Sequence, residues 1–382
     1  MSRPLAIYLD NNATTSLDPT VREVMMLYFD QEYGNAASRT HEYGLRAKRA
    51  VQTARRQIAE VVAADPAEVI FTSGATEANN LALLGLAPFA TAQARRHIIT
   101  TTIEHKAVAE PIDALERQGF SVTRVAVDRS GRVSAEAVLT ALTPETIAVS
   151  VMFANNETGI LQPLTEIAEG LAGHSAYFHV DAAQAFGKVI EPLRHKRIDL
   201  ISASAHKLFG PKGVGGLIAR RRGAEAPPLS PLMFGGGHER GLRPGTLPVP
   251  LIAAFGEAAV RGLAEGPTRE RVALARRAQA LGALSAIGVT PIGDQAHVLP
   301  HVLMASFEGV DSEALMLAIK DVAAVSNGSA CTSSSYAPSH VLEAMGLPTS
   351  IVEGAVRFSW SHQGEEPPWE AIANRISSLR PT

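Results

Sequence analysis

The feature that most constrains the fold is a series of seven short apolar runs, most of them separated by helix-like stretches. The runs are residues 69–72, 97–101, 122–127, 147–154, 177–180, 200–205 and 214–219. Such alternation is typical of parallel strands covered by helices. Only the short loop HKLFGPKG separates the last two runs, so we expect one antiparallel edge strand there. The sequence predicts an α/β fold with a mainly parallel seven-stranded sheet.

The C-terminal third indicates a second, smaller unit. A Gly- and Pro-rich stretch at 233–250 precedes a long helical region from Leu251 to about Leu284. Helical spacing also occurs at 20–30, 39–62 and 313–321, and strand-like runs at 302–308 and 355–360. We predict a large domain at 15–255 and a small C-terminal α/β domain formed by 1–14 and 256–382.

Composition excludes several classes of protein. The chain has 382 residues, 46% of them hydrophobic, and a net charge of only -3, with scattered basic residues. We therefore expect no direct binding of DNA or RNA. One cysteine cannot form an internal disulfide or a multi-thiolate metal site, so we predict no metal. No apolar run approaches about 18 residues, which predicts a soluble, cytoplasmic protein without membrane contact.

Polar residues follow the apolar runs, where open α/β sheets bind their ligands. The stretch VIFTSGATEANN gives a strand, then Gly74, then a helix start that carries Thr76. Free backbone N-H groups at such a start suit a phosphate, although an ordinary capped helix start explains the pattern equally simply. No Gly-Lys-Ser/Thr follows the glycine, so this is not a Walker loop.

Asp181 comes directly after an apolar run, with Gln184 three residues later. A carboxylate at a strand end caps a helix in many proteins. A buried acid is also what a cofactor pyridine needs to keep its ring nitrogen protonated, so that the ring can accept electrons. The residues alone leave both interpretations open.

Lys207 is the lysine best placed to react. It follows another apolar run, next to Ser204 and His206, whereas Lys212 lies in a Gly-Pro loop. A lysine at the end of a buried strand loses hydration, which lowers its pKa toward the nucleophilic neutral amine. We predict that Lys207 is the amine that bonds to a carbonyl cofactor.

A phosphate cup, a ring-nitrogen acid and a reactive lysine, in that order, describe a pyridoxal 5'-phosphate site. With its other motifs, the chain resembles the cysteine desulfurases of the aminotransferase class V group, within the fold type I pyridoxal phosphate enzymes. The matching motifs are YLDNNATT, GNAASRTHEYG, VIFTSGATEANN, IEHKAV, NNETG, HVDAAQ, SAHK, GGGHERGLRPGT, NGSACTSSS and VRFS, between residues 8 and 359.

The resemblance implies a role for each residue around the cofactor ring. Lys207 would hold the cofactor covalently, and Asp181 would pair with the ring nitrogen. Gln184 would donate a hydrogen bond to the phenolic oxygen. His105, in IEHKAV, would stack on the ring and assist proton transfer. A structural histidine, bonded to backbone at the end of a strand, is the other interpretation of His105.

The resemblance also implies a phosphate site and a dimer. Ala75 and Thr76 at the helix start, with Ser204 and His206 beside the lysine, would hold the phosphate. Thr246 would reach the phosphate of the neighbouring subunit, which makes a homodimer the expected unit.

The amino-acid substrate needs a cation for its carboxylate. The resemblance assigns this role to Arg357, although alternation along AVRFSW also allows an arginine on the exposed side of a strand. Asn156 and Asn35 would complete the pocket with hydrogen bonds.

The only cysteine, Cys331, lies in a small, polar loop at about 326–338. The resemblance implies that its thiolate attacks the sulfur of bound L-cysteine, releases L-alanine and leaves a persulfide for an acceptor protein. Selenocysteine lyase or cysteine sulfinate desulfinase activity is the nearest alternative, and a non-catalytic, scaffold-like relative is another.

The destination of the sulfur stays open between three pathways. GNAASRTHEYG and LRPGTLPVP are similar to desulfurases that supply DNA phosphorothioate modification. The sequence ends at Thr382 without the extended tail by which housekeeping members typically engage an iron-sulfur scaffold. Iron-sulfur cluster assembly and tRNA thiolation are the other two pathways.

Overall fold

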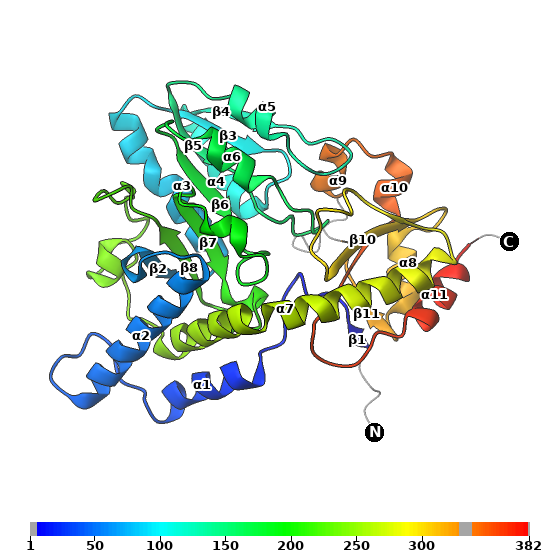
Figure 1. Cartoon of the computed structure of the whole chain (residues 1–382), viewed down its shortest axis with the longest axis horizontal. Coiled ribbons are helices and arrows are strands. Elements are labelled where there is room, and N and C mark those ends of the chain that lie inside the picture. The colour runs from blue at the N-terminus through cyan, green and yellow to red at the C-terminus, as the bar shows by residue number, and fades with distance from the viewer. Residues whose placement is uncertain (1–5, 328–337, 381–382) are drawn as a thin grey trace.

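The computed structural model describes residues 6–327 and 338–380. Its largest sheet has seven strands in the order β2-β8-β7-β6-β5-β3-β4 (Figure 1). Their bounds are β2 (Val69–Thr72), β3 (His97–Thr101), β4 (Ser121–Val125), β5 (Thr146–Ser150), β6 (Tyr177–Asp181), β7 (Leu200–Ser204) and β8 (Gly215–Ala219). Each of the seven apolar runs forms one strand, which confirms the predicted mainly parallel α/β sheet.

Neighbouring residues on each strand enter two different cores. Phe71, for example, packs with Val149 and Phe178 on one face, whereas Ile70 packs with Ala148 on the other. Seven helices accompany this sheet: α1 (Pro19–Asp30), α2 (Glu42–Val61), α3 (Ala75–Ala92), α4 (Lys106–Arg117), α5 (Ala135–Thr140), α6 (Leu164–Gly170) and α7 (Val249–Ser285). Burial of both faces explains why the strands read as continuous apolar runs rather than as an alternating pattern.

The antiparallel strand was predicted in the right direction but in the wrong position. β8 is antiparallel to β7, as the short connection between them requires, but it is not an edge strand. β2 pairs with its other side, also antiparallel, so that β2 and β4 form the two edges. β2 therefore runs parallel to β7, and their carboxyl ends lie on the same side of the sheet.

The C-terminal part builds a smaller unit with its own core. Its sheet is β12-β10-β9, and a separate parallel pair joins β1 to β11. The elements are β1 (Ile7–Tyr8), β9 (Val289–Pro291), β10 (Val302–Phe307), α8 (Ser312–Ile319), β11 (Ala323–Ala324), α9 (His340–Ala344), α10 (Thr349–Glu353), β12 (Ala355–Ser359) and α11 (Trp369–Ser377). Leu9 packs in this core with residues of α7 and β10, so an N-terminal segment does join the small unit.

Helix α7 connects the two units (Figure 1). Its 37 residues contribute Phe255 to the core beneath the large sheet and Leu284 to the core of the small unit. The predicted boundary between residues 255 and 256 falls inside this helix, and the division into two domains stays a prediction. No helix in the described part of the chain is long and apolar enough to cross a membrane.

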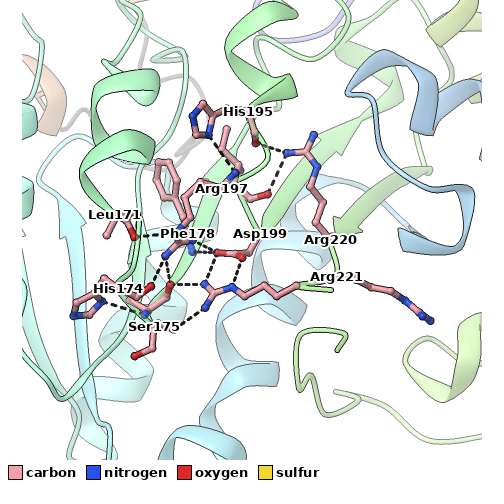
Figure 2. Close-up of polar contacts among 12 residues, drawn as sticks. Leu171, His174, Ser175, Phe178, His195, Arg197, Asp199, Arg220 and Arg221 are labelled. Atoms are coloured by element: carbon pink, nitrogen blue, oxygen red, sulfur yellow. Dashed lines mark hydrogen bonds and ion pairs between the residues drawn. The ribbon is translucent and has the colours of Figure 1, made fainter. Parts of the chain in front are cut away.

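One buried carboxylate connects three strands at the edge of the sheet that lies opposite the predicted site residues. Asp199, just before β7, is 2% exposed. Its carboxylate accepts the backbone N-H of Phe178 on β6 at 2.6 Å and forms ion pairs with Arg197 at 2.5 Å and with Arg222, beyond β8, at 2.7 Å (Figure 2). The Asp199 backbone carbonyl accepts the N-H of Arg220 at 2.7 Å. Asp199 therefore fixes β6, β7 and β8 relative to one another.

We predict that Asp199→Asn lowers the free energy of unfolding by about 3 kcal/mol, because it leaves two arginines without a buried anion. The matched control is Asp113→Asn, which breaks the exposed ion pair with Arg124 and should cost less than about 1 kcal/mol. Urea unfolding followed by circular dichroism measures both values. Equal losses in the two variants would contradict the role given to Asp199.

Candidate active site

The predicted site residues gather at one edge of the large sheet. Asp181 ends β6, and Ser204 ends β7, directly before a 3₁₀ turn that carries Lys207. His105 follows β3 as the N-cap of α4, and Asn156 lies beyond β5. Because parallel strands have their carboxyl ends on the same side, these side chains surround a common space.

The turn between β2 and α3 forms the predicted phosphate cup. Helix α3 begins at Ala75, and its N-cap residue, Gly74, has no side chain that could cap the free N-H groups. A Cβ atom on Gly215 would lie 2.6 Å from the Cα of Gly74, so only glycine at 215 lets this turn approach β8 so closely. The Ser204 hydroxyl lies 3.6 Å from the place where a Cβ on Gly74 would be. The helix N-terminus, with exposed Thr76, and the Ser204 hydroxyl therefore suit a phosphate.

Lys207 and Gln184 meet at the backbone of the N-terminal segment. The Lys207 amine donates to the carbonyl of Ala13 at 2.8 Å and to that of Asn12. The Gln184 amide also donates to the Asn12 carbonyl, at 2.9 Å. The side chains of Lys207 and Gln184, the predicted partner of the phenolic oxygen, therefore bind the same backbone carbonyl and lie close together in space.

Asp181 is 5% exposed, and its carboxylate is held at both oxygens. One oxygen accepts from the Asn79 side chain at 2.8 Å, and the other accepts from the N-H of Ala183 at 2.9 Å. The N-H bond to Ala183 is the local capping arrangement expected from sequence. The acid is also buried at the end of β6, the neighbour of the strand that leads to Lys207, so the capping role and a role as partner of a ring nitrogen are compatible.

Two histidines at this edge are neutral. His105 accepts the N-H of Ala107 at Nδ1, 3.0 Å away, so the neutral ring carries its proton on Nε2. Burial lowers the pKa of His105, and the positive charge of Lys207 lowers it further, against the opposing effect of Asp181. Burial and the nearby lysines lower the pKa of His206 to about 4, and its ring bonds to Thr14 at 3.2 Å. Both rings can therefore donate a hydrogen bond without carrying charge.

Arg357 is buried, at 3% exposure, so the interpretation of an arginine on an exposed strand face is wrong. Its guanidinium forms an ion pair with Asp10 at 2.5 Å and donates to the backbone carbonyl of Asn156 at 2.7 Å. The exposed residue Asn35 bonds only within its own turn, to Ala37 and Ser38, among the described residues. Asn156 thus touches Arg357 directly, whereas the role of Asn35 stays a prediction.

Six of the buried polar atoms that have no partner among the described residues belong to residues of this site. They are Asn12 Oδ1, Asn79 Oδ1, Glu104 Oε2, Asn156 Oδ1, Gln184 Oε1 and Arg357 Nε. Buried polar groups in proteins nearly always have hydrogen-bond partners. The donors and acceptors present, with the phosphate cup and the lysine, fit pyridoxal 5'-phosphate and an amino acid.

The segment that contains Cys331 lies outside the described residues, but both of its ends are bound near the pocket. Ser326 and Arg357 form an antiparallel backbone bridge, with an N-H to carbonyl distance of 2.6 Å. On the other side, Ser339 donates its hydroxyl to Glu157 at 2.5 Å. The predicted role of Cys331 as the nucleophile therefore stays a prediction.

Sequence reasoning gave no role to several residues that build this site. Asp10, Asn12, Asn79, Glu104 and Glu157 all lie inside motifs that were matched, but their partners are distant in sequence. Among the described residues, no group of three or more His, Cys, Asp or Glu side chains could hold a metal ion. Thr246 is exposed, away from its own chain's core.

The aminotransferase class-V family model matches residues 7–366. The chain is 46% identical over 356 residues to "Cysteine desulfurase IscS" of Anaeromyxobacter sp. (strain Fw109-5), which covers 93% of this chain and 87% of the relative. It is 42% identical to "Cysteine desulfurase, mitochondrial" of Saccharomyces cerevisiae, over 98% of this chain and 76% of the relative.

Two solved structures are similar over nearly their full length. The crystal structure of DndA from Streptomyces lividans is 48% identical, with a TM-score of 0.82 over 94% of this chain and 99% of that one. The structure of SspA in complex with cysteine is 33% identical, with a TM-score of 0.82 over 96% of this chain and 100% of that one.

A buried acid beside His105 makes stability depend on pH. Glu104 accepts from the Thr101 hydroxyl at 2.7 Å and from the N-H of Met152 at 2.9 Å. Burial raises the pKa of Glu104 from 4.5 to about 8, and the negative charge of Asp181 adds to the rise. Between pH 5 and 8 the folded protein therefore keeps a proton that the unfolded chain releases, so this group lowers stability as the pH rises.

We predict that the free energy of unfolding of Glu104→Gln rises relative to that of wild type between pH 5 and pH 8. The amide does not titrate in this range, so the variant lacks the loss of stability that Glu104 causes in wild type. The control is Glu110→Gln, an exposed position on α4. Urea unfolding at four pH values in this range gives the differences. A gap between Glu104→Gln and wild type that stays constant across the range would contradict the raised pKa.

Proposed function

Because the chain belongs to the aminotransferase class-V family and is a pyridoxal phosphate-dependent cysteine desulfurase of fold type I, we propose that the site described above takes L-cysteine and leaves its sulfur on Cys331. The observation that carries the proposal is the convergence of Lys207, Asp181 and Arg357 at one edge of the sheet. A reactive amine, an acid and a carboxylate anchor are the three groups that this chemistry needs.

Pyridoxal phosphate, when bound, supplies a protonated ring that accepts electrons from the α-carbon of the amino acid. Asp181, fixed by Asn79 and by the N-H of Ala183, holds the positive charge on the ring nitrogen. Ala75, Thr76, Ser204 and His206 hold the phosphate. The chain therefore binds the cofactor at both of its charged ends.

Lys207 has two roles in the proposal. Its amine would hold the cofactor covalently, and as a free amine it would serve as the base for the proton on the substrate α-carbon. The carbonyls of Asn12 and Ala13 accept hydrogen bonds from Nζ of the free amine and so hold it at this edge of the sheet. His105, neutral and protonated on Nε2, would act as a hydrogen-bond donor to the ring or the substrate.

Arg357 orients the substrate. Its Nη atoms are held by Asp10 and by the carbonyl of Asn156, and its buried Nε has no partner among the described residues. A guanidinium fixed in this way presents a rigid donor edge to the substrate carboxylate, aided by the side chain of Asn156.

The sulfur step is a displacement at the substrate sulfur. The Cys331 thiolate attacks that sulfur, a sulfur-sulfur bond forms and the bond between the substrate sulfur and its β-carbon breaks. The electron pair stays with the carbon, which takes up a proton. L-cysteine and a thiol thus give L-alanine and a persulfide, without an external oxidant or reductant.

We also propose a cytoplasmic homodimer in which Thr246 reaches the partner's phosphate. Thr246 is exposed, and the same segment shows Phe234 at 88% and Met233 at 44% exposure. Large apolar side chains that stand out together are typical of protein interfaces. Light scattering should give twice the chain mass of 40.4 kDa.

The persulfide passes to an acceptor protein, and the three proposed pathways are DNA phosphorothioation, iron-sulfur cluster assembly and tRNA thiolation. Protein loaded with labelled cysteine sulfur and mixed with copurifying proteins identifies the acceptor by the label that it takes up.

We predict that Arg357→Lys raises the KM for L-cysteine about 10- to 100-fold, because lysine cannot bind a carboxylate with two parallel hydrogen bonds. Arg375→Lys, in an exposed pair with Asp321, is the matched control. Steady-state release of alanine measures both. An unchanged KM in Arg357→Lys would remove Arg357 from the substrate pocket.

The proposed reaction is tested by changing Cys331 and Lys207 separately. Cys331→Ala should keep the cofactor's absorbance but release alanine at least about 100-fold more slowly, since the nucleophile is lost. Lys207→Ala should lose the covalent cofactor mass after borohydride reduction, while the exposed control Lys212→Ala keeps it. Full turnover of cysteine by Cys331→Ala would favour the lyase or desulfinase alternative.

A further inference from the structure

A second cavity lies on the other side of the Lys207 turn. Its wall includes Lys188 beyond β6, Leu208 and Phe209 directly after Lys207, Arg269 on α7 and Trp360 after β12. The volume that the centre of a water-sized sphere can occupy in this cavity is about 70 Å³, which is enough for a small organic molecule. No residue predicted to bind the cofactor or the substrate lines it, so this cavity is separate from the site described above.

Lys188 is the unusual group in this wall. Among the described residues its amine has one hydrogen-bond partner, the Nε2 atom of His301 at 3.4 Å, and no carboxylate. Protein atoms surround it closely, yet its side chain keeps some accessible surface because it borders the cavity. Burial lowers the pKa of Lys188 to about 7, and the positive charges of Lys207 and Arg269 add to the effect. A buried ammonium without an anion is costly, and a bound anion removes that cost.

The other titratable groups around the cavity do not supply the missing anion. Burial holds the pKa of His301 well below its usual value and lowers that of His362 to about 4, so both rings are neutral. Arg269 is a second cation, paired with Glu265 at 2.9 Å and packed over the ring of Phe209. Glu270 also lines the cavity, but it is an exposed residue.

Most of the remaining wall is apolar. Leu208, Leu299, Ala273 and Trp360 are all almost fully buried, and Phe209 packs edge-on against His362 at 4.5 Å between ring centres. Such a wall binds hydrocarbon and does not replace the hydration of a dianion. An amino acid would bring an ammonium next to Lys188 and Arg269, which like-charge repulsion disfavours.

We propose that this cavity binds a small monocarboxylate with an apolar body. Its carboxylate accepts hydrogen bonds from Lys188, and its body packs against Leu208, Phe209 and Trp360. The ligand therefore joins the core below the large sheet, which contains Leu208, to the core of the small unit, which contains Trp360. The proposal does not depend on the reaction assigned to the enzyme.

Binding is tested on the holoenzyme with sodium butyrate as the probe and butyramide as its neutral match. Because Arg357 also attracts carboxylates, calorimetry is done on wild type and on Arg357→Lys. Butyrate should bind to both with a saturable heat and raise the melting temperature, whereas butyramide binds at least 10-fold more weakly. Equal binding of butyramide, or loss of all butyrate binding in Arg357→Lys, would overturn the proposal.

The decisive variant is Lys188→Met, which keeps the length of the side chain and removes the charge. Butyrate affinity in the Arg357→Lys background should fall at least 10-fold, while Lys196→Met, at an exposed lysine, leaves it unchanged. Unchanged affinity in Lys188→Met would refute the role of Lys188. Should that variant fail to fold, crystals of wild type with 4-bromobutyrate decide: bromine density in this cavity supports the proposal, and density only beside Arg357 or none overturns it.

Discussion

The geometry of the cofactor site depends on a carboxylate at the far end of the sheet. Asp199 fixes the amino ends of β6 and β7 and the carboxyl end of β8. A slip of one residue between strands reverses which face each side chain occupies. Such a slip would turn Asp181 away from Lys207, although neither residue touches Asp199. The arginines that bind Asp199 thus help to set the geometry of the catalytic edge. That edge lies about five residues, or roughly 16 Å, farther along each strand.

Asn12 has the complementary position at the catalytic edge itself. Its backbone N-H donates to the Ser359 hydroxyl at the end of β12, and its side-chain amide donates to the Asn156 carbonyl. Its own carbonyl accepts from both Lys207 and Gln184. One residue of the N-terminal segment therefore connects the strand that carries the carboxylate anchor with the lysine. Movement of the small unit would therefore displace the carbonyls of Asn12 and Ala13 that bind the amine.

The sequence predicted the strands well because burial on both faces leaves continuous apolar runs. It also placed Asp181 and Lys207 at the ends of neighbouring strands, because parallel strands end at one edge. It did not predict the position of β8 inside the sheet. The short loop before β8 determines the direction of that strand, but it does not reveal that β2 pairs with its other side. Asp10 and Glu104 were missed for a similar reason: their roles come from Arg357 and from Met152, which are distant in sequence. The interpretation of Arg357 as an exposed residue was wrong because alternation along a strand does not reveal which other elements cover each face.

The attachment of Ser326 to Arg357 sets a limit on how far the thiol can travel. Cys331 is the fifth residue after Ser326, and a fully extended chain advances about 3.5 Å per residue. With Ser326 fixed, the α-carbon of Cys331 therefore stays within about 17 Å of it. In the proposed reaction, a tether of this length favours attack on a substrate held near Ser326 over transfer to a distant surface. In this proposal, an acceptor protein must bring its own receiving atom within that distance of Ser326, so the surface around Ser326 selects the proteins that can collect sulfur.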